Sequence, residues 1–384
     1  MSTAGACRGR TESDASTSTQ DEEEENATHT RKLVCRQRRR RKLIEEFAKE
    51  EGQGLTLLES RAVKRPTREK YLKEVRAWLE HHDATAAGHA ADGDVDASLC
   101  TYMTNLWAQG QQSYTGEALM AGLLHFMPEF NKFGDKKIPR AWRALRGWRL
   151  LTPARSRRPV AWPIWAGVCW ELCRQGFYLR ALYVLLMVTT YMRPGEPLSM
   201  QRQDLVPPTT GVSTGWSILL YPDTRAARSK VHAKNETVDV QSELAPWLES
   251  LMPLLAQGPP DERVFPFSYH DFLRSWRQAV SQLPLDLVPY QARHSGASLD
   301  AARGLRTRKQ IMDRGRWRSQ SSLLRYEKHA RLAGSLASLE PVWRVYFEQA
   351  AELLEGLLCG RLGADALQLP VTHGSRRRPS AGTT

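Results

Sequence analysis

The sequence predicts a mainly α protein with a small antiparallel β-sheet, an α+β fold, and three observations lead to this class. Apolar residues recur at helical spacing both before residue 152 and after residue 160. Two short stretches, 216–221 (WSILLY) and 237–240 (TVDV), have the composition of strands, and the polar segment between them is typical of a hairpin connection. The stretch 152–159 (TPARSRRP) contains two prolines, a serine and three arginines, which is the composition of a linker.

The domain organisation follows from the length of the chain and the order of these features. A chain of 384 residues suits two domains with tails. Blocks of like charge near the N-terminus repel and keep that region extended. We expect an acidic and basic tail without stable structure at 1–58, a helical domain at 61–152, a larger domain at 155–345, and a C-terminal helix with an unstructured tail at 346–384.

The helices are predicted by their apolar faces. Thr67 is expected to cap the first long helix, because its hydroxyl can accept a hydrogen bond from the first turn. In the larger domain, 164–192 is expected to be strongly apolar and helical, and the chain is expected to be helical again after Val264. The longest apolar run, Ala181 to Met192, is too short to cross a membrane. Three further helices are expected at 99–107, 117–126 and 141–150.

The charge balance favours a polyanionic partner. Lys and Arg outnumber Asp and Glu by 55 to 42, which gives a net charge of +13. The basic run 36–42 (RQRRRRK) is a nuclear address, an arm that binds phosphates or the solvated start of a helix, and these alternatives stay open. We expect a nuclear protein if the source is eukaryotic and a cytoplasmic one otherwise.

The six cysteines do not predict a metal site. They are scattered, and none forms a C-x2-C unit. Cys169 and Cys173 lie close together in an apolar helical pattern, so we expect them to be small buried hydrophobic residues. Scattered cysteines fit a reducing compartment. The start of the chain lacks the apolar stretch of a signal peptide, so no leader is expected.

The first candidate functional feature is the segment 191–196 (YMRPGE), at the end of the apolar helix. Burying Arg193 there is costly unless it has an anionic partner. Glu196, three residues further on, can hold its guanidinium group in place. The alternative is an arginine at a helix end that binds the last carbonyl groups.

The second feature is the predicted hairpin turn 225–234 (RAARSKVHAK). A lysine at the tip of a hairpin is a flexible point charge that can reach a ligand, and Lys230 and Lys234 are the two candidates. The alternative is a solvated turn, which is the simpler explanation for this segment taken alone.

The third feature is the segment 289–296 (PYQARHSG), which opens a helix. Helix N-termini favour anions, and Arg293 and His294 lie in the first turn or next to it. Cations at the positive end of a helix dipole are unfavourable unless an anion binds there. The two cations therefore predict an anion at this helix end.

The fourth feature is the segment 315–329 (GRWRSQSSLLRYEKH). The surrounding residues 293–331 contain eleven Lys or Arg and three Asp or Glu. Such a face repels itself without phosphates, and phosphate contacts supply most of the non-specific affinity for DNA. The alternative is a solvated pair of basic helices, which the aromatic residues Trp317 and Tyr326 make less satisfactory.

In this order, the four features resemble the catalytic domain of the tyrosine recombinase (phage integrase) family. The family pattern is an R-x-x-E element, a hairpin lysine, an H-x-x-R element, a His or Trp after a glycine, and a nucleophilic tyrosine. Arg193 and Glu196 match the first element, Lys230 best matches the lysine, and Arg293 matches the second arginine.

The end of the pattern is matched as well. Trp317 is at the His/Trp position, and Tyr326 lies nine residues further on, as the family spacing requires. The resemblance covers about residues 155–335, and the helical unit before it is similar in place and size to the family's DNA-binding core-binding domain. Each element is weak alone, whereas five in the right order are a strong match.

The resemblance implies a DNA strand-transfer enzyme. Tyr326 would form a 3′-phosphotyrosyl link with double-stranded DNA, Arg193 and Arg293 would bind the phosphate, and Lys230 would protonate the leaving oxygen. The resemblance also implies no cofactor and no metal, a homo-oligomer that is a tetramer on DNA, no membrane, and a place in a transposable element. Further DNA contacts are expected at Arg316, Arg318 and Arg325.

One departure from the family pattern bears on activity. The H-x-x-R element is Tyr290-Gln-Ala-Arg293 in this chain. A phenol can donate a hydrogen bond to a phosphate oxygen, but it is a poor proton shuttle at neutral pH. This departure favours a catalytically inactive DNA-binding protein on the same fold. Two further alternatives stay open: a type IB topoisomerase, and a helical scaffold whose basic face only gives solubility.

Overall fold

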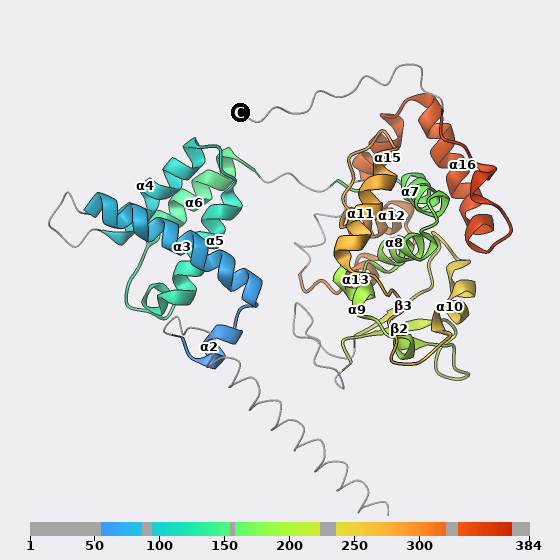
Figure 1. Cartoon of the computed structure of the whole chain (residues 1–384), viewed down its shortest axis with the longest axis horizontal. Coiled ribbons are helices and arrows are strands. Elements are labelled where there is room, and N and C mark those ends of the chain that lie inside the picture. The colour runs from blue at the N-terminus through green and yellow to red at the C-terminus, as the bar shows by residue number, and fades with distance from the viewer. Residues whose placement is uncertain (1–54, 87–93, 154–157, 223–235, 320–328, 371–384) are drawn as a thin grey trace, which may run out of the picture. The chain divides into compact units, whose positions relative to one another are not determined.

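The computed structural model describes residues 55–86, 94–153, 158–222, 236–319 and 329–370. The chain divides into two compact units between residues 155 and 156, and each unit has a hydrophobic core of its own. Helices make up most of the described residues, and the strands form one three-stranded antiparallel sheet (Figure 1). The predicted fold class, mainly α with a small antiparallel sheet, is therefore confirmed.

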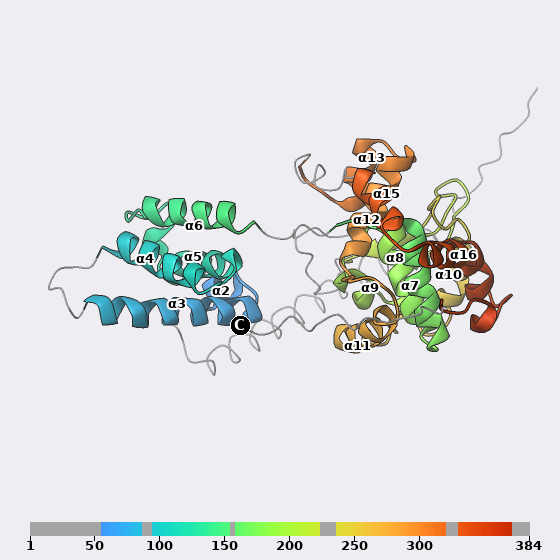
Figure 2. The ribbon, with the colours of Figure 1, turned by 90° about the horizontal axis from the view of Figure 1, so that it is seen from above.

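The first unit is a bundle of helices, which run side by side in Figure 2. Its core contains Trp78, Leu119 and Trp148, all buried. The prediction that Thr67 caps the first long helix is wrong, because that helix begins two residues earlier, at Arg65. Proline is tolerated in the first turn, so Pro66 does not delay the start. The helices are α2 (Leu57–Arg61), α3 (Arg65–Ala86), α4 (Val95–Ala108), α5 (Ser113–Phe126) and α6 (Pro139–Leu151), with a short 3-10 turn at Pro128–Phe130.

The second unit surrounds the helices that the apolar run forms. A large core contains residues from all parts of this unit, including Trp165, Leu186 and Phe272. The helices are α7 (Trp162–Arg174), α8 (Tyr178–Thr190), α9 (Gly195–Ser199), α10 (Leu248–Ala256), α11 (Tyr269–Val280), α12 (Gln291–Arg303), α13 (Arg308–Gly315), α15 (His329–Ala337) and α16 (Pro341–Leu358); the strands are β1 (Leu205–Val206), β2 (Ser217–Leu220) and β3 (Glu236–Asp239).

The apolar stretch 164–192 is helical, as predicted, and it forms two helices, α7 and α8. Gly176 separates α7 from α8 and has a φ of 81°, in the left-handed region that glycine adopts without steric cost. The chain turns there, and the two helices pack against each other. Cys169 and Cys173 on α7 are buried, as predicted, and neither is in a disulfide.

The sheet confirms the predicted hairpin strands and adds a strand that the sequence did not predict. The strand order is β1-β2-β3, and both pairs are antiparallel. Ile218 on β2 lies opposite Val238 on β3, and both side chains are buried against the core. Strand β1 has only two residues, which is too short for an alternating pattern. Helix α10 has nine residues with Pro253 inside it, and the sequence did not predict it either.

Close contact between α8 and α12 depends on one glycine. A Cβ atom at Gly296 would lie 1.8 Å from the carbonyl oxygen of Val188, so no other residue fits without moving the backbone. This contact places the start of α12 beside the end of α8, the two helix ends that carry Arg293 and Arg193.

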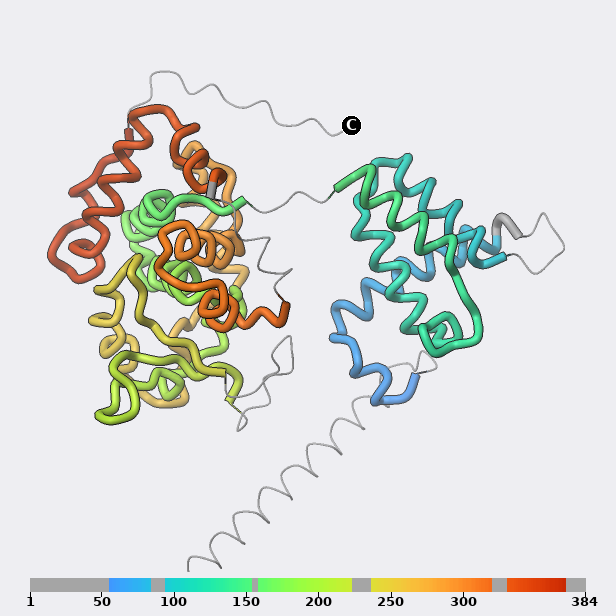
Figure 3. Tube along the Cα trace, turned by 180° about the vertical axis from the view of Figure 1, so that it is seen from behind, coloured from blue at the N-terminus to red at the C-terminus, as the bar shows by residue number. Residues whose placement is uncertain are grey.

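The last long helix belongs to the core of the second unit. Figure 3 shows α16 beside α7. The Tyr346 hydroxyl donates to the fully buried Glu171 carboxylate at 2.7 Å, and Phe347 packs against Gly167. The expected boundary at 345/346 falls within α16, whose apolar face completes this core.

None of the helices in the described part of the chain has both the length and the apolar character that a membrane span requires. Within the same residues, no group of three or more His, Cys, Asp or Glu side chains is close enough together to hold a metal ion.

Candidate functional site

The described residues include most of the predicted site. Arg318 is exposed just after α13. Lys230, Lys234, Arg325 and Tyr326 lie outside the described residues, as does the basic run 36–42. The predicted site residues within the described part are Arg193, Glu196, Tyr290, Arg293, Arg316, Trp317 and Arg318.

The segment after α8 forms a tight ion pair between Arg193 and Glu196. The Arg193 guanidinium donates to Glu196 Oε1 at 2.7 Å, and the Arg193 backbone N–H donates to Oε2 at 2.7 Å. Burial acts to lower the pKa of Arg193, but the Glu196 charge and hydrogen bond outweigh it and raise the pKa. The Arg193 side chain keeps 17% of its surface exposed, so a ligand can still reach a charged guanidinium group.

Glu196 also receives Arg316, from the end of α13. The Arg316 guanidinium donates to Glu196 Oε2, and its Nε lies 3.3 Å from an oxygen of Glu236, the first residue of β3. The Tyr221 hydroxyl donates to Glu196 Oε1 at 3.4 Å. Arg316 was expected to contact DNA, but its side chain is only 7% exposed and is held by two carboxylates. Its left-handed backbone, with a φ of 54°, ends α13 and allows this ion-paired position.

Arg293 is the third residue of α12 and is almost fully buried. Its guanidinium donates to the carbonyl oxygens of Tyr191 and Gly315. The sequence predicted that an anion compensates for a cation at this helix end, whereas in the structure these two carbonyl groups stabilise the charge. Burial, followed by repulsion from Arg193 and Arg316, lowers the pKa of Arg293 to about 10, so the group stays charged at neutral pH.

Trp317 covers the Arg293 guanidinium. The centre of the Trp317 ring lies 4.7 Å from the guanidinium carbon, a cation–π contact. The same ring stacks on Tyr191, with centroids 6.1 Å apart and an angle of 24° between the planes. Gly315 makes this possible, because a Cβ atom there would lie 2.0 Å from the indole ring.

Tyr290, at the position where the family pattern has histidine, lies beside the arginine pair. It is among the smaller causes that raise the pKa of Arg193 and of Arg293, which fits a phenol close to both groups. Its ring packs against His294, with centroids 5.4 Å apart. The site thus places a phenol near the two guanidinium groups.

Backbone strain in the described part of the chain is concentrated here. Tyr191, Tyr221 and Arg316 are the three non-glycine residues with positive φ among the described residues. Each such residue costs on the order of 1–3 kcal/mol, and strained residues cluster at functional sites. All three contact the same few groups: Tyr191 binds Arg293, and the other two bind Glu196.

The charges at this place suit an anion. Arg193 and Arg316 pair with Glu196, and Arg316 also pairs with Glu236, whereas Arg293 donates to backbone carbonyl groups. The three guanidinium groups and two carboxylates together leave one net positive charge. Planar guanidinium groups bind phosphate oxygens in pairs. The arrangement can therefore bind a phosphate and stabilise negative charge that develops on it.

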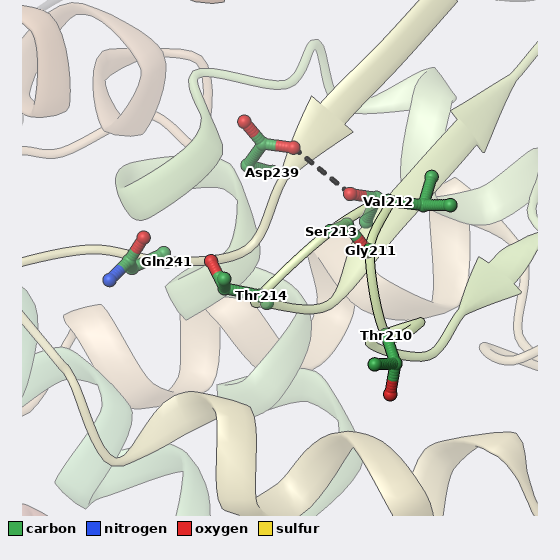
Figure 4. A pocket seen from close by; sticks show the side chains of 9 residues that line it. Thr210, Gly211, Val212, Ser213, Thr214, Asp239 and Gln241 are labelled. Atoms are coloured by element: carbon green, nitrogen blue, oxygen red, sulfur yellow. Dashed lines mark hydrogen bonds between the residues drawn. The ribbon is translucent and has the colours of Figure 1, made fainter.

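A separate cavity of about 730 Å³ is unsuited to phosphate. Among the described residues it is lined by 210–215 with Ser217, Asp239 and Gln241, none of which is a lysine or arginine (Figure 4). The Ser217 hydroxyl donates to the Asp239 carboxylate at 2.9 Å. Because the one charged group among these described lining residues is an acid, they would repel a phosphate.

Several residues of the site were missed by sequence reasoning. Tyr221 and Glu236 lie at the facing ends of β2 and β3, so their places follow from the hairpin register. Three further residues support Tyr191: Asp300 accepts from its hydroxyl, Arg306 pairs with Asp300, and Arg314 lies over its ring. In the sequence they are distinguished only as charged residues in a helical region.

No protein-family profile matches the sequence, and no curated protein matches it. Among solved structures, a lambda integrase dimer bound to a COC′ core site has a TM-score of 0.49 and 14% identity; the match covers 76% of this chain and 77% of that chain. The Tn1549 transposon integrase with transposon right end DNA has a TM-score of 0.46 and 12% identity over 72% of this chain and 93% of that one.

The Tn1549 integrase with circular intermediate DNA has a TM-score of 0.40 and 12% identity, over 71% of this chain and 99% of that chain. Each of these proteins is named an integrase, the kind of protein that the ordered motifs resemble. Since all three TM-scores are below 0.5, the chemistry of this chain has to be inferred from its own residues.

Proposed function

We propose that the chain is a tyrosine recombinase-type DNA strand transferase that cleaves and rejoins DNA through Tyr326. The observation that carries this proposal is the convergence of Arg193, in the segment after α8, and Arg293, on α12. Arg193 donates to the Glu196 carboxylate, and Arg293 donates to two backbone carbonyl groups. The Trp317 ring packs on Arg293, and Tyr290 contributes to the pKa of both arginines. Two anchored arginines next to strained backbone are suited to an anionic transition state.

The proposed reaction is a transesterification at phosphorus. The Tyr326 hydroxyl gives its proton to water as its oxygen forms a bond to the scissile phosphorus, and the bond from phosphorus to the 5′ oxygen breaks. Lys230, or Lys234, gives a proton to that leaving oxygen. The 5′ hydroxyl of a second strand then attacks the phosphotyrosyl bond and releases Tyr326. Covalent catalysis conserves the bond energy, so the proposal requires no nucleotide cofactor and no metal.

The arginines act on the phosphate in this proposal. Arg193, whose side chain is 17% exposed, binds its non-bridging oxygens, and Tyr290 donates a hydrogen bond to one of them. Arg293, which is 1% exposed and donates to two carbonyl oxygens, has to exchange these partners for a phosphate oxygen when DNA binds. Arg316 is a positioning residue, because its guanidinium is occupied by Glu196 and Glu236. A phenol at position 290 does not take the nucleophile's proton at neutral pH, so we expect slow chemistry.

Double-stranded DNA is the proposed partner of both units. The exposed face of α6 carries Arg140, Arg143 and Arg146, together with Trp142, which is 45% exposed. Asp96 fixes the start of this helix, since its carboxylate accepts the backbone N–H groups at the first turn at 2.9 and 2.7 Å. A rigid basic helix is suited to phosphate contacts. Arg318 is proposed as a contact of the second unit.

The test is covalent capture on DNA. The full chain is incubated with labelled nicked duplexes of randomised sequence, in which the short strand beyond the nick diffuses away after cleavage. Denaturing gels then show protein attached to DNA. We expect a covalent adduct with the native chain and none with Tyr326→Phe, which keeps DNA binding. An equal adduct yield from Tyr326→Phe would contradict the assignment of the nucleophile.

A second candidate function is DNA binding without cleavage, and Tyr290 in place of histidine favours it. Binding of duplex DNA without any adduct would support this candidate. Relaxation of a supercoiled plasmid without joining of partners would support a type IB topoisomerase. Failure to bind DNA at any salt concentration would support the remaining alternative, a helical scaffold whose basic face only gives solubility.

Assembly as a homo-oligomer, a tetramer on DNA, is also proposed from the resemblance. Removing α16 cannot test it, because α16 packs on α7 within the core. Val342 and Val345, on the exposed side of α16, are better sites. If α16 contacts another protomer, Val345→Asp reduces assembly on DNA, measured by sedimentation; unchanged assembly removes α16 from the interface. Nuclear location and a place in a transposable element stay proposals.

A further inference from the structure

We infer that Tyr191 and Asp300 form a positioning pair that sets the geometry of both phosphate-binding arginines. The inference rests on the proposed function and names residues that neither the family pattern nor the sequence singled out. Tyr191 touches no phosphate in this scheme. It acts through Arg193, two residues further along the chain, and through Arg293, which binds its carbonyl oxygen.

The first step of the argument is the backbone of Tyr191. It ends α8 with φ 54° and ψ 31°, a left-handed conformation that costs a non-glycine residue about 1–2 kcal/mol. This turn aims the Tyr191 carbonyl at Arg293 and starts the segment that carries Arg193 and Glu196. A residue that only ended the helix would be glycine, which adopts this conformation without cost.

The second step is what holds Tyr191 in that conformation. Its hydroxyl donates to Asp300 Oδ2, and Arg306 donates to the same oxygen. Tyr191 and Asp300 are both fully buried. Asp300 belongs to α12, the helix that also carries Arg293. One helix therefore binds Tyr191 at both ends, through the hydroxyl by Asp300 and through the carbonyl by Arg293.

The third step is the layer of cations and aromatic rings around the Tyr191 ring. Trp317 stacks on it, and the Arg314 guanidinium carbon lies 5.6 Å from its centre. Arg314 also donates to the carbonyl oxygens of Thr189, at 2.9 Å, and of Gln241, at 2.9 Å. Arg314, on α13, thus joins the end of α8 to Gln241, the second residue after β3.

These contacts fix the relative positions of the groups proposed to bind phosphate. Arg193 follows the left-handed turn, Arg293 binds the carbonyl of that turn, and Trp317 lies between the Tyr191 ring and Arg293. Without its hydroxyl, the Tyr191 ring is no longer held by Asp300. The buried Asp300 carboxylate then keeps its hydrogen bond from Arg306 and loses the one from Tyr191. A small shift of the turn then moves both arginines together.

The experiment compares Tyr191→Phe with a matched control, Tyr346→Phe, in the full chain. Tyr346 is also a buried tyrosine whose hydroxyl donates to a buried carboxylate, that of Glu171 at 2.7 Å, but it joins α16 to α7. Two quantities are measured for each variant: the single-turnover rate of adduct formation at saturating protein, and the Kd for the same DNA.

We expect Tyr191→Phe to slow adduct formation on the order of 10- to 100-fold with less than a roughly threefold change in Kd, because misplaced catalytic groups lose rate more than affinity. Tyr346→Phe should keep the native rate. Asp300→Asn should slow adduct formation to a similar extent as Tyr191→Phe. Equal rates for Tyr191→Phe and the native chain would overturn the inference, as would an equal loss in both tyrosine variants.

A second readout does not depend on cleavage. The Nε–H resonance of Arg293 in the DNA-free protein, assigned with Arg293→Lys, reports the surroundings of its guanidinium group. It should shift in Tyr191→Phe and stay in place in Tyr346→Phe, and an unmoved resonance in both variants would contradict the inference. If the native chain forms no adduct, the proposed function fails, whereas this readout still tests the positioning pair.

Discussion

Arg316 donates to the buried carboxylate of Glu196, so the end of α13 holds the segment that carries Arg193. The same guanidinium reaches Glu236 at the start of β3. One buried arginine therefore joins the R-x-x-E element, the hairpin base and the Gly-x-Trp element. Because these three elements are far apart in the sequence, the pairing is a property of the folded site.

Glu196→Gln tests this connection. The change keeps the shape of the side chain and removes the charge that two guanidinium groups share, so Arg193 and Arg316 repel each other. Breaking a buried ion pair costs about 3–5 kcal/mol. We expect a lower free energy of unfolding, measured with urea, and a large loss of adduct formation.

Glu171→Gln is the matched control for that prediction. Glu171 is equally buried and pairs with Arg174 at 2.7 Å, but it lies under α16. This variant should lose stability and keep its rate of adduct formation per folded molecule. The connection would be wrong if the two glutamine variants lost adduct formation to the same extent.

Arg193→Lys tests the need for a planar guanidinium group. A lysine keeps the charge, but it cannot bind Glu196 and two phosphate oxygens with a fixed fork. Removing one preorganised donor from a transition state costs on the order of 10²- to 10³-fold in rate. Single-turnover adduct formation should fall by that amount, with a small change in Kd for DNA.

Arg202→Lys is the control, because Arg202 is also mostly buried and donates to the Leu255 carbonyl oxygen at 2.7 Å, away from the site. It should leave the rate unchanged. Near-native cleavage by Arg193→Lys would show that Arg193 does not act on the phosphate.

The sequence predicted those parts of the site that depend on local spacing. Glu196 lies three residues after Arg193, in the turn that opens α9, so their ion pair follows from the sequence. The two strands of the hairpin could be predicted from their strand-like composition. Gly176 could also have indicated the break between α7 and α8, because glycine favours the left-handed conformation found there.

Other parts could not be predicted, because they join residues that are distant in the sequence. Tyr191 and Asp300 meet only when α8 and α12 pack, and nothing local marks either residue as half of a pair. Arg316 is one arginine in a basic segment, so its burial between two carboxylates depends on where β3 lies. The basic composition of the segment favoured a DNA contact for Arg316, because composition does not show whether an arginine is buried or exposed.

Alkaline pH should destabilise the second unit through its buried tyrosines. Burial, followed by the Glu196 charge, raises the pKa of Tyr221 to about 12, and burial raises the pKa values of Tyr183, Tyr191 and Tyr346 as well. Above about pH 10 the unfolded chain releases these protons while the folded chain keeps them, so the free energy of unfolding falls as pH rises.

The lowered pKa of Arg293 and of Arg314, each about 10, opposes part of this effect. The measurement is a spectrophotometric tyrosine titration alongside urea unfolding at each pH. Buried tyrosines should ionise only together with unfolding, and Tyr346→Phe should reduce the loss of stability above pH 10. Ionisation of all eleven tyrosines near pH 10 in the folded chain would contradict the prediction.

Gly296→Ala tests the contact between α8 and α12 that brings the arginines together. The new Cβ atom would lie 1.8 Å from the Val188 carbonyl oxygen, and a backbone atom in the middle of a helix cannot move alone. Overpacking of a core costs about 1–3 kcal/mol, and here it separates the helices that carry Arg193 and Arg293. We expect a lower Tm and a lower rate of adduct formation.

Gly334→Ala is the matched control for Gly296→Ala, since Gly334 lies inside α15 and a Cβ atom there meets no atom within 4 Å. Alanine at a free helical position stabilises by about 0.4–1 kcal/mol. The two variants should therefore change Tm in opposite directions. A Tm for Gly296→Ala at or above the native value would mean that α12 can shift away from α8 at no cost, and the arginines would then not depend on that packing for their positions.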